Sequence, residues 1–351
     1  MTALAYFTPT VAVKLGSADL SSQQLSGLKR ITVENELNVA GMAELEFDLD
    51  EGEDDSTKKG VNMKAFAVGT KISISLGFEK AEEIFQGQVA GVDPVFGSCS
   101  TFTVRAYDGL YRLQFGTHLR QFLKKTDSAI ASQMAKESGL SASVENSGFE
   151  LPSMLQFNIT NYEFLSKRIK QLDFEMLMSK GKFHFRKPKE GASPVATLKY
   201  MDELDTFDAK LSVLKEGNKV TVFGWDVKKK ALFKGENTGA PSSAKMGGKE
   251  TGFQVNGDYP KSELWLTDRT VPSNAAAKTL AGAASGDAIN QFIEGEGELN
   301  LGDPKVVAGT NVKVTGVDDP FEGVYYVTQS NHTFDFDDGY RTHFKFRRTG
   351  I

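Results

Sequence analysis

The sequence has very little cysteine and histidine. Among its 351 residues Cys99 is the single cysteine, which excludes an internal disulfide, a thiolate cluster and a redox pair. The four histidines follow no metal-ligand spacing, and no third ligand lies near the two that fall on one predicted hairpin. These histidines are His118, His184, His332 and His343. We therefore expect no metal site and no cofactor.

Long apolar runs and an excess of basic charge are also missing. No segment has the roughly 18 uncharged apolar residues of a membrane span, and residues 1–16 lack the basic start of a signal peptide. The formal net charge is −5, and no Lys/Arg cluster is interleaved with stacking aromatics. We expect a protein folded in the cytoplasm, with no membrane insertion and no nucleic-acid recognition.

Catalytic motifs are absent as well. The sequence has no nucleophile elbow, no phosphate-binding glycine loop that ends in Lys-Ser or Lys-Thr, and no dinucleotide fingerprint after a strand. A pair of carboxylates could still act together, because acid and nucleophile need only be close in space. With 46 acidic residues this condition is easily met by chance. We expect no enzyme, and a cell-wall hydrolase stays an alternative.

The sequence is rich in segments with a period of two. In residues 43–49 apolar side chains alternate with acidic ones, which predicts a half-buried strand. The same alternation recurs at both ends of the chain, and Asp338-Gly339 predicts a hairpin turn. We predict a mainly β protein with α+β insertions, built on two antiparallel β-barrels.

Two stretches of about 40 residues share an order of strand, loop, Phe-x-Gly, strand, turn and strand. The matched positions are Gly69, Thr70, Phe85 and Gly87 in the first stretch and Gly309, Thr310, Phe321 and Gly323 in the second, which continues to a turn at Gly339. One supersecondary unit used twice explains the match. Coincidence is the alternative, because Gly-Thr and short alternating strands are common in β proteins.

The segments between these stretches have a different composition. Residues 126–140 predict a short capped helix, and residues 161–185 predict a second helix followed by a hairpin. After Gly224-Trp225-Asp226 comes a Gly/Ser-rich loop and an Ala-rich helix. We interpret Trp225 as a barrel-edge aromatic, with ligand stacking as the alternative.

These patterns divide the chain into four predicted parts. They are a first barrel over 1–116, an α+β module over 117–204, a second barrel over 205–230 and 298–351, and an insertion with a flexible loop over 231–297.

An ordered series of segments carries a family resemblance. The segments read FQGQVAGVD, TFTVRAYDGLYRLQ, FNITNYEFLSKRIKQLDFEMLMSKGKFHF, KVTVFGWDVKKK and GTNVKVTGVDDPFEGVYYVTQSNHTFDFDDGYRTHFKFRR. In this order they resemble the phage late control D family. That family contains the baseplate hub proteins of contractile tails and the N-terminal hub part of VgrG spike proteins. The resemblance runs from about residue 69 to the end and is weakest over 231–297.

The resemblance implies a structural role. Hubs of this family are homotrimers in which each chain contributes two barrels similar to the tail-tube subunit. The implied partners are a hexameric tail-tube protein, a trimeric spike and other baseplate proteins. Because the sequence stops after the last hub strand, we expect the spike to be a separate chain. The implied location is a phage virion tail or a secreted contractile particle that is assembled in the bacterial cytoplasm.

The positions that the resemblance and the repeat single out are architectural. They are Gly69, Thr70, Phe85, Gly87, Gly224, Trp225, Gly309, Thr310, Phe321, Gly323 and Gly339. We expect them to set strand entries and tight loops. A tail-associated receptor- or glycan-binding protein is a further alternative function.

Overall fold

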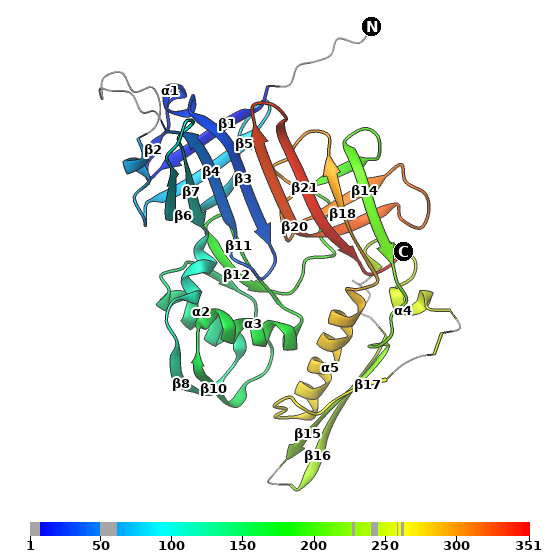
Figure 1. Ribbon diagram of the computed structural model, residues 1–351. Coiled ribbons are helices and arrows are strands. Elements are labelled where there is room, and N and C mark those ends of the chain that lie inside the picture. The colour runs from blue at the N-terminus through cyan, green and yellow to red at the C-terminus, as the bar shows by residue number, and fades with distance from the viewer. Residues whose placement is uncertain (1–7, 50–61, 227–228, 240–244, 258, 261–262) are drawn as a thin grey trace.

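The structure is a computed structural model that describes residues 8–49, 62–226, 229–239, 245–257, 259–260 and 263–351 (Figure 1). Within these residues the strands form one sheet of 13 strands and three smaller sheets. The large sheet occupies the upper part of the view, and the longer helices lie below it. The predicted mainly β fold with α+β insertions is confirmed. No helix in the described part of the chain is long and apolar enough to cross a bilayer.

The first repeat unit lies near the N-terminus. Its elements are β1 (Thr10–Leu15), β2 (Ala18–Asp19), α1 (Ser22–Leu25), β3 (Leu28–Glu36), β4 (Met42–Asp48), η1 (Met63–Phe66), β5 (Lys71–Gly77), β6 (Glu82–Val95) and β7 (Thr101–Tyr107). The strands pair in the order β3-β4-β7-β6-β5-β1-β2. On β4 the alternation predicted from the sequence holds, since Ala43, Leu45 and Phe47 are fully buried while the glutamates between them face outward.

The second repeat unit is built mostly from the C-terminal part of the chain. Its strands are β13 (Ala196–Lys199), β14 (Leu204–Leu211), β18 (Ile293–Leu299), β19 (Asn311–Thr315), β20 (Gly323–Asp335) and β21 (Gly339–Arg348). They pair in the order β14-β18-β21-β20-β19-β13, which repeats the order β3-β4-β7-β6-β5-β1 strand by strand. The internal repeat is therefore confirmed. One strand differs in direction, because β13 is parallel to β19 whereas β1 is antiparallel to β5.

The two Gly-Thr turns make the same backbone hydrogen bonds. The N–H of Gly69 donates to the carbonyl of Val89 at 2.8 Å, and the N–H of Gly309 donates to that of Val327 at 2.9 Å. Both glycines have a positive φ, of 89° and 85°. These turns are thus equivalent, as the sequence predicts.

The Phe-x-Gly motifs are not equivalent. Val89 and Val327 are equivalent because they accept from the two glycines of the turns. Two and four residues before them, Gly87 corresponds to Tyr325 and Phe85 corresponds to Gly323. The sequence match was shifted by two residues because each motif follows a loop, and the two loops differ in length. Loop length is free to vary between copies of a repeat, whereas the register of paired strands is not.

A small α+β module follows the first unit. Its elements are η2 (Gly109–Gln114), β8 (His118–Lys125), α2 (Asp127–Glu137), β9 (Ala142–Val144), β10 (Leu151–Ile159), α3 (Asn161–Leu172), β11 (Glu175–Ser179) and β12 (Lys182–Arg186). Both predicted helices form. The helix α3 begins at a capping box of Thr160 and Glu163 and ends at Asp173, which adopts the left-handed conformation.

The structure differs from the prediction around residues 205–230. The strand β15 (Lys219–Asp226) pairs with β16 (Ala231–Thr238) and β17 (Glu263–Leu266) in a separate sheet, not with the second unit. This sheet packs against α5 (Asn274–Ile289), and α4 (Gly252–Val255) lies nearby in Figure 1. Its alternating valines fit any half-buried sheet, so the pattern could not assign the partner strands.

The predicted insertion over 231–297 also has different limits. Its end falls inside β18, which is a strand of the second unit. Residues 240–244 of its predicted flexible loop lie outside the described residues. The helix α5 is rich in alanine and packs against α3, and one hydrophobic core joins it to the α+β module.

Candidate functional site: the joint between the repeat units

The two repeat units meet where β3 pairs with β20. This antiparallel joint runs from the pair Arg30–Asp335 to the pair Glu36–Gln329, and it makes the two predicted barrels one continuous sheet. Phe334 of the second unit is 3% exposed and lies in the hydrophobic core of the first unit. The joint is therefore part of the folded core and not a hinge between separate domains.

His332 is buried in this joint. Its Nδ1 lies 2.9 Å from the hydroxyl of Tyr340 and 3.0 Å from Oγ1 of Thr342. Burial lowers the pKa of His332 to about 4, so the ring is neutral near pH 7. His343 pairs with the residue next to His332 and is partly exposed, so the two rings occupy opposite faces of the hairpin and cannot share a metal.

A turn after β3 connects the joint to the α+β module. The N–H of Asn38 donates to the carbonyl of Met176 at 2.8 Å, and Oδ1 of Asn38 accepts from the N–H of Met176 at 2.7 Å. Asn38 has a positive φ of 68°, a conformation that asparagine tolerates better than most residues. The hydroxyl of Tyr162 donates to the carbonyl of Asn38 at 2.7 Å. These contacts hold β11 and α3 against the first unit.

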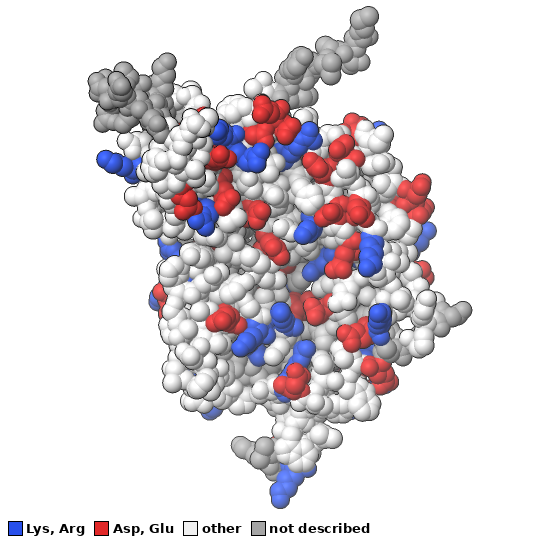
Figure 2. All heavy atoms as spheres, viewed as in Figure 1, with Lys and Arg blue, Asp and Glu red and all other residues white. Residues whose placement is uncertain are grey.

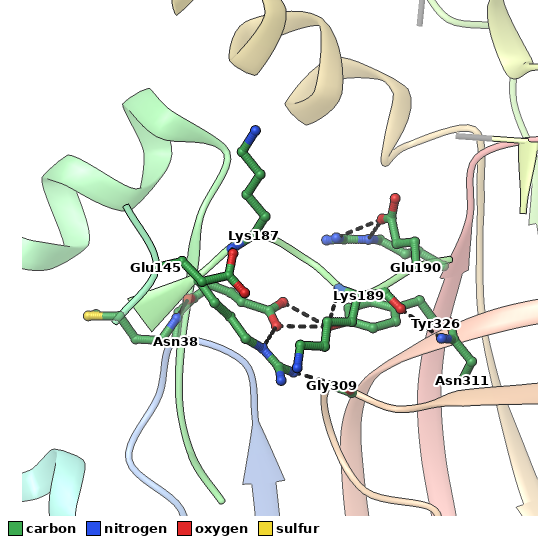
Figure 3. Close-up of polar contacts among 12 residues, drawn as sticks. Asn38, Glu145, Lys187, Lys189, Glu190, Gly309, Asn311 and Tyr326 are labelled. Atoms are coloured by element: carbon green, nitrogen blue, oxygen red, sulfur yellow. Dashed lines mark hydrogen bonds and ion pairs between the residues drawn. The ribbon is translucent and has the colours of Figure 1, made fainter. Parts of the chain in front are cut away.

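A buried polar cluster holds the same module against the second unit (Figure 3). Glu175 on β11 is 2% exposed and accepts a hydrogen bond from Nε of Arg186 at 2.9 Å. The hydroxyl of Tyr326 donates to both carboxylate oxygens of Glu175, at 2.8 and 2.9 Å. Nη2 of Arg186 donates to the carbonyl of Gly309 at 3.2 Å. The Gly-Thr turn of the second unit is thus joined to β11 and β12.

The charges of this cluster depend on one another. Burial raises the pKa of Glu175, while the Arg186 guanidinium and the Tyr326 hydroxyl oppose that shift by stabilising the carboxylate. Burial, together with the neighbouring carboxylate, raises the pKa of Tyr326, which keeps the phenol protonated as a donor. The carboxyl group of Glu175 thus lies between the Arg186 side chain and a phenol that donates to both of its oxygens.

A second ion pair covers the edge of the cluster. Arg347 donates to Oε1 of Glu190 through Nη2 at 2.9 Å, and its guanidinium lies 5.2 Å from the centre of the Tyr326 ring. Nδ2 of Asn311 donates to the carbonyls of Lys189 and Ala192, at 2.8 and 3.1 Å. The segment between β12 and β13 is consequently fixed against β19 and β21.

The outward face of the large sheet carries charges of both signs, which are interspersed over the view in Figure 2. On this face Glu44 pairs across strands with Arg105, and at the equivalent place in the second unit Glu296 pairs with Lys345. A glutamate directly opposite a basic residue is thus a repeated feature of the two units. Opposite charges directly across a sheet stabilise the pairing modestly.

The structure places the architectural residues in several parts of the fold. Gly309 and Thr310 lie in the second unit beside the buried cluster, while Gly69, Thr70, Phe85 and Gly87 lie in the first unit. Gly323 lets the Arg348 guanidinium approach, since an added Cβ would lie 2.4 Å from Nη2, and Gly339 forms the predicted turn. Phe321 precedes β20. Gly224 and Trp225 lie apart from the others on β15, where Trp225 is 56% exposed.

Sequence reasoning missed the residues that make the buried cluster. Glu175 and Arg186 stand in short apolar strands where an inward charge needs a partner. A charged residue inside the run FEMLM is a signal of this kind. Its partners are far away in sequence, so the signal alone could not name Tyr326.

The fold defined by these two units is that of phage and prophage tail proteins. The 43 kDa tail protein of prophage MuSo2 from Shewanella oneidensis matches with a TM-score of 0.69 and 16% identity, over 97% of this chain and 98% of that chain. The tail protein from Neisseria meningitidis MC58 matches with a TM-score of 0.68 and 11% identity, over 97% of both chains.

A third solved structure comes from a secretion system. The Escherichia coli c3393 protein, described as a component of the type VI secretion system with similarity to the T4 tail proteins gp27 and gp5, matches with a TM-score of 0.61 and 10% identity. The match covers 98% of this chain and 77% of that chain. At these identities the likeness shows the fold.

The chain belongs to the family described as the Alg8 N-terminal domain, whose model matches residues 7–335. That family is not the late control D family to which the sequence segments point, so the latter resemblance stays a prediction. No curated protein matches the sequence.

Proposed function

We propose that this chain is a structural baseplate hub, of which three copies form a ring of six repeat units. The observation that carries the proposal is the duplicated order of six strands in one chain. Three such chains present six related surfaces on one side and keep three-fold symmetry on the other. A ring of this kind can join a hexameric tail tube to a trimeric spike. The fold shared with tail proteins supports this role.

The proposal names the partners and the setting. They are two further copies of the chain, a hexameric tail-tube protein, a trimeric spike and other baseplate proteins. The particle would be a phage virion tail or a secreted contractile particle assembled in the bacterial cytoplasm. The role is structural and needs neither a cofactor nor catalysis, and a cleared band in a peptidoglycan zymogram would contradict that part.

Negative-stain class averages of the purified chain, alone and mixed with the tube protein, test the hub proposal. We expect six-lobed rings with three-fold symmetry. Compact monomers that never cap a tube would overturn the proposal.

A receptor- or glycan-binding tail protein is a second candidate, and one surface favours it. Trp225 and Trp265 are 56% and 66% exposed on neighbouring strands, and the rings of Phe223 and Trp265 lie 5.9 Å apart, edge to face. Exposed aromatic faces are suited to stacking on sugar rings. Glycan-array binding that is lost in Trp225→Ala and Trp265→Ala would support this candidate, and an array without signal would contradict it.

A further inference from the structure

The repeat places a second pair of strand edges at the positions equivalent to β3 and β20, and these two edges are not paired with each other inside the chain. The counterpart of β3 is β14. Residues 329–333, in the outer half of β20, correspond to residues 91–95, which form the outer half of β6. Within the described residues β14 pairs with β18, apart from a single bridge between Leu204 and Tyr200, and residues 91–95 of β6 pair with β7 alone. Each chain therefore has two open strand edges that are related by the repeat to the two edges already joined inside it.

Burial differs between the joined and the open edges. Phe334 at the internal joint is 3% exposed, whereas its counterpart Phe96, one residue beyond β6, is 71% exposed. The inward face of β3 is fully buried at Ile31, while its counterpart Phe207 on β14 is half-buried. The apolar side chains that meet inside the chain are thus present again at the open edges, without a partner strand.

The edge of β14 also has a place for an aromatic side chain. A groove of about 550 Å³ opens beside this strand, and its apolar lining consists of Tyr200, Phe207, Ala209, Val317 and Phe321. At the internal joint Phe334 enters the core of the neighbouring unit. The groove occupies the corresponding position for Phe96.

We propose that the outer half of β6 in one copy pairs with β14 of the next copy, antiparallel and in the register of the β3–β20 joint, with Phe96 in the groove beside β14. This inference rests on the proposed ring and identifies its contact between copies. The contact is heterologous, because each copy offers a β6 edge to one neighbour and a β14 edge to the other. Three copies then give six joints, of which three lie inside chains and three lie between them.

The register follows from the internal joint. Asn331 and Glu34 are paired there, and their counterparts across the proposed contact are Asp93 and Lys210. An acidic residue thus meets a basic one on the outward face, which favours this register.

Cysteine pairs test the register directly. In a Cys99→Ser background, which removes the exposed native thiol, Val92→Cys is combined with Leu211→Cys, the pair next to Asp93 and Lys210. Paired residues of antiparallel strands have Cα atoms about 4.5–5.5 Å apart, within reach of a disulfide. We expect covalent trimers on non-reducing gels. The matched control, Asp93→Cys with Leu211→Cys, places the thiols on opposite faces of the sheet and should give none.

A second variant tests the groove. Phe96→Ala should weaken trimer formation at least about tenfold in sedimentation velocity. Phe157→Ala, which removes a similarly exposed ring on β10, should leave it unchanged.

The possible outcomes separate the two proposals. Trimers that form normally with Phe96→Ala, or that cross-link as well in the control pair as in the register pair, would overturn this inference and leave the hub proposal standing. Both proposals would be overturned if the wild-type chain stays monomeric at its highest soluble concentration and neither cysteine-pair variant cross-links.

Discussion

In the first repeat unit the carbonyl of Gly69 accepts a hydrogen bond from Nε2 of Gln88 at 3.1 Å, and Oε1 of the same side chain accepts from Nη2 of Arg112 at 2.6 Å. In the second unit the carbonyl of Gly309 accepts directly from the buried Arg186 at 3.2 Å. Both Gly-Thr turns are thus connected to an arginine of the α+β module, one through an amide near the surface and the other through a buried ion pair.

The two units share the backbone of the turn but differ in the side chains that surround it. The turn itself is set by its positive φ and by strand pairing, which the two units share. The neighbouring side chains differ because the second unit is closed over by β11 and β12, where a charge must have a partner. Equivalent substitutions in the two units should therefore have unequal effects.

The largest effect is expected from Glu175→Ala. It leaves the buried Arg186 without its carboxylate and the Tyr326 hydroxyl without an acceptor, and breaking a buried pair in this way costs about 3–5 kcal/mol of the free energy of unfolding. The matched change in the first unit is Gln88→Ala, which removes the hydrogen bonds of this amide to Gly69 and Arg112 near the surface, at about 2 kcal/mol. Urea denaturation of both variants measures the difference. Equal losses would show that the two turns are held alike.

The next effect is a pH dependence that has no counterpart at the equivalent position of the first unit. His332 is buried with a pKa lowered to about 4, while its counterpart in β6, Pro94, does not titrate. An unfolded histidine titrates near 6.5, so between about pH 6.5 and 4 the unfolded chain binds more protons. This residue's contribution is complete above pH 6.5 and is lost as the pH falls toward 4, by about 3 kcal/mol.

The variant His332→Gln isolates that contribution. The amide keeps a hydrogen-bond acceptor for Tyr340 but does not titrate in this range. Urea midpoints of the variant should fall less between pH 6.5 and 4 than those of the wild type. Parallel pH profiles would contradict the assignment.

Cross-strand packing in the two cores gives a smaller effect. In the first unit Leu45 faces Val104, whereas the equivalent pair in the second unit is Gly297 and Phe344. A Cβ on Gly297 would lie 3.0 Å from the Phe344 ring, so Gly297→Ala should cost about 1–3 kcal/mol through overpacking.

A double-mutant cycle with Phe344→Leu tests this explanation. The cost of Gly297→Ala should fall once the ring is gone, with a coupling of at least about 1 kcal/mol. Gly282→Ala on α5, where an added Cβ meets nothing within 4 Å, is the control and should stabilise the helix. Additive losses would show that the ring is not the obstacle.

The sequence could predict strands and the repeat better than their partners. Alternation reports that one face is buried, which is why Ala43, Leu45 and Phe47 are as predicted. It does not report which strand lies alongside, so β15 was assigned to the second unit although it belongs to another sheet. The contacts of the buried cluster could not be predicted for the same reason, because Glu175 and Tyr326 are 151 positions apart.

The smallest effect compares the two glycines themselves. Gly69→Ala places a Cβ in open space, so its cost is backbone strain at positive φ, about 1 kcal/mol. Gly309→Ala has the same strain, and its Cβ would also lie 2.9 Å from Nη2 of Arg186. We expect the second substitution to cost about 1 kcal/mol more in urea denaturation.

The source of that excess can be tested in the Glu175→Ala background. The guanidinium of Arg186 is the end of a flexible side chain, and Glu175 holds it in place through its Nε. Without Glu175 the guanidinium can move away from the new Cβ. In that background the two alanine substitutions should cost nearly the same, because both then report strain at one backbone geometry. An excess for Gly309→Ala that persists there would assign the difference to Leu177, whose Cδ1 would lie 3.1 Å from the new Cβ, and not to the ion pair.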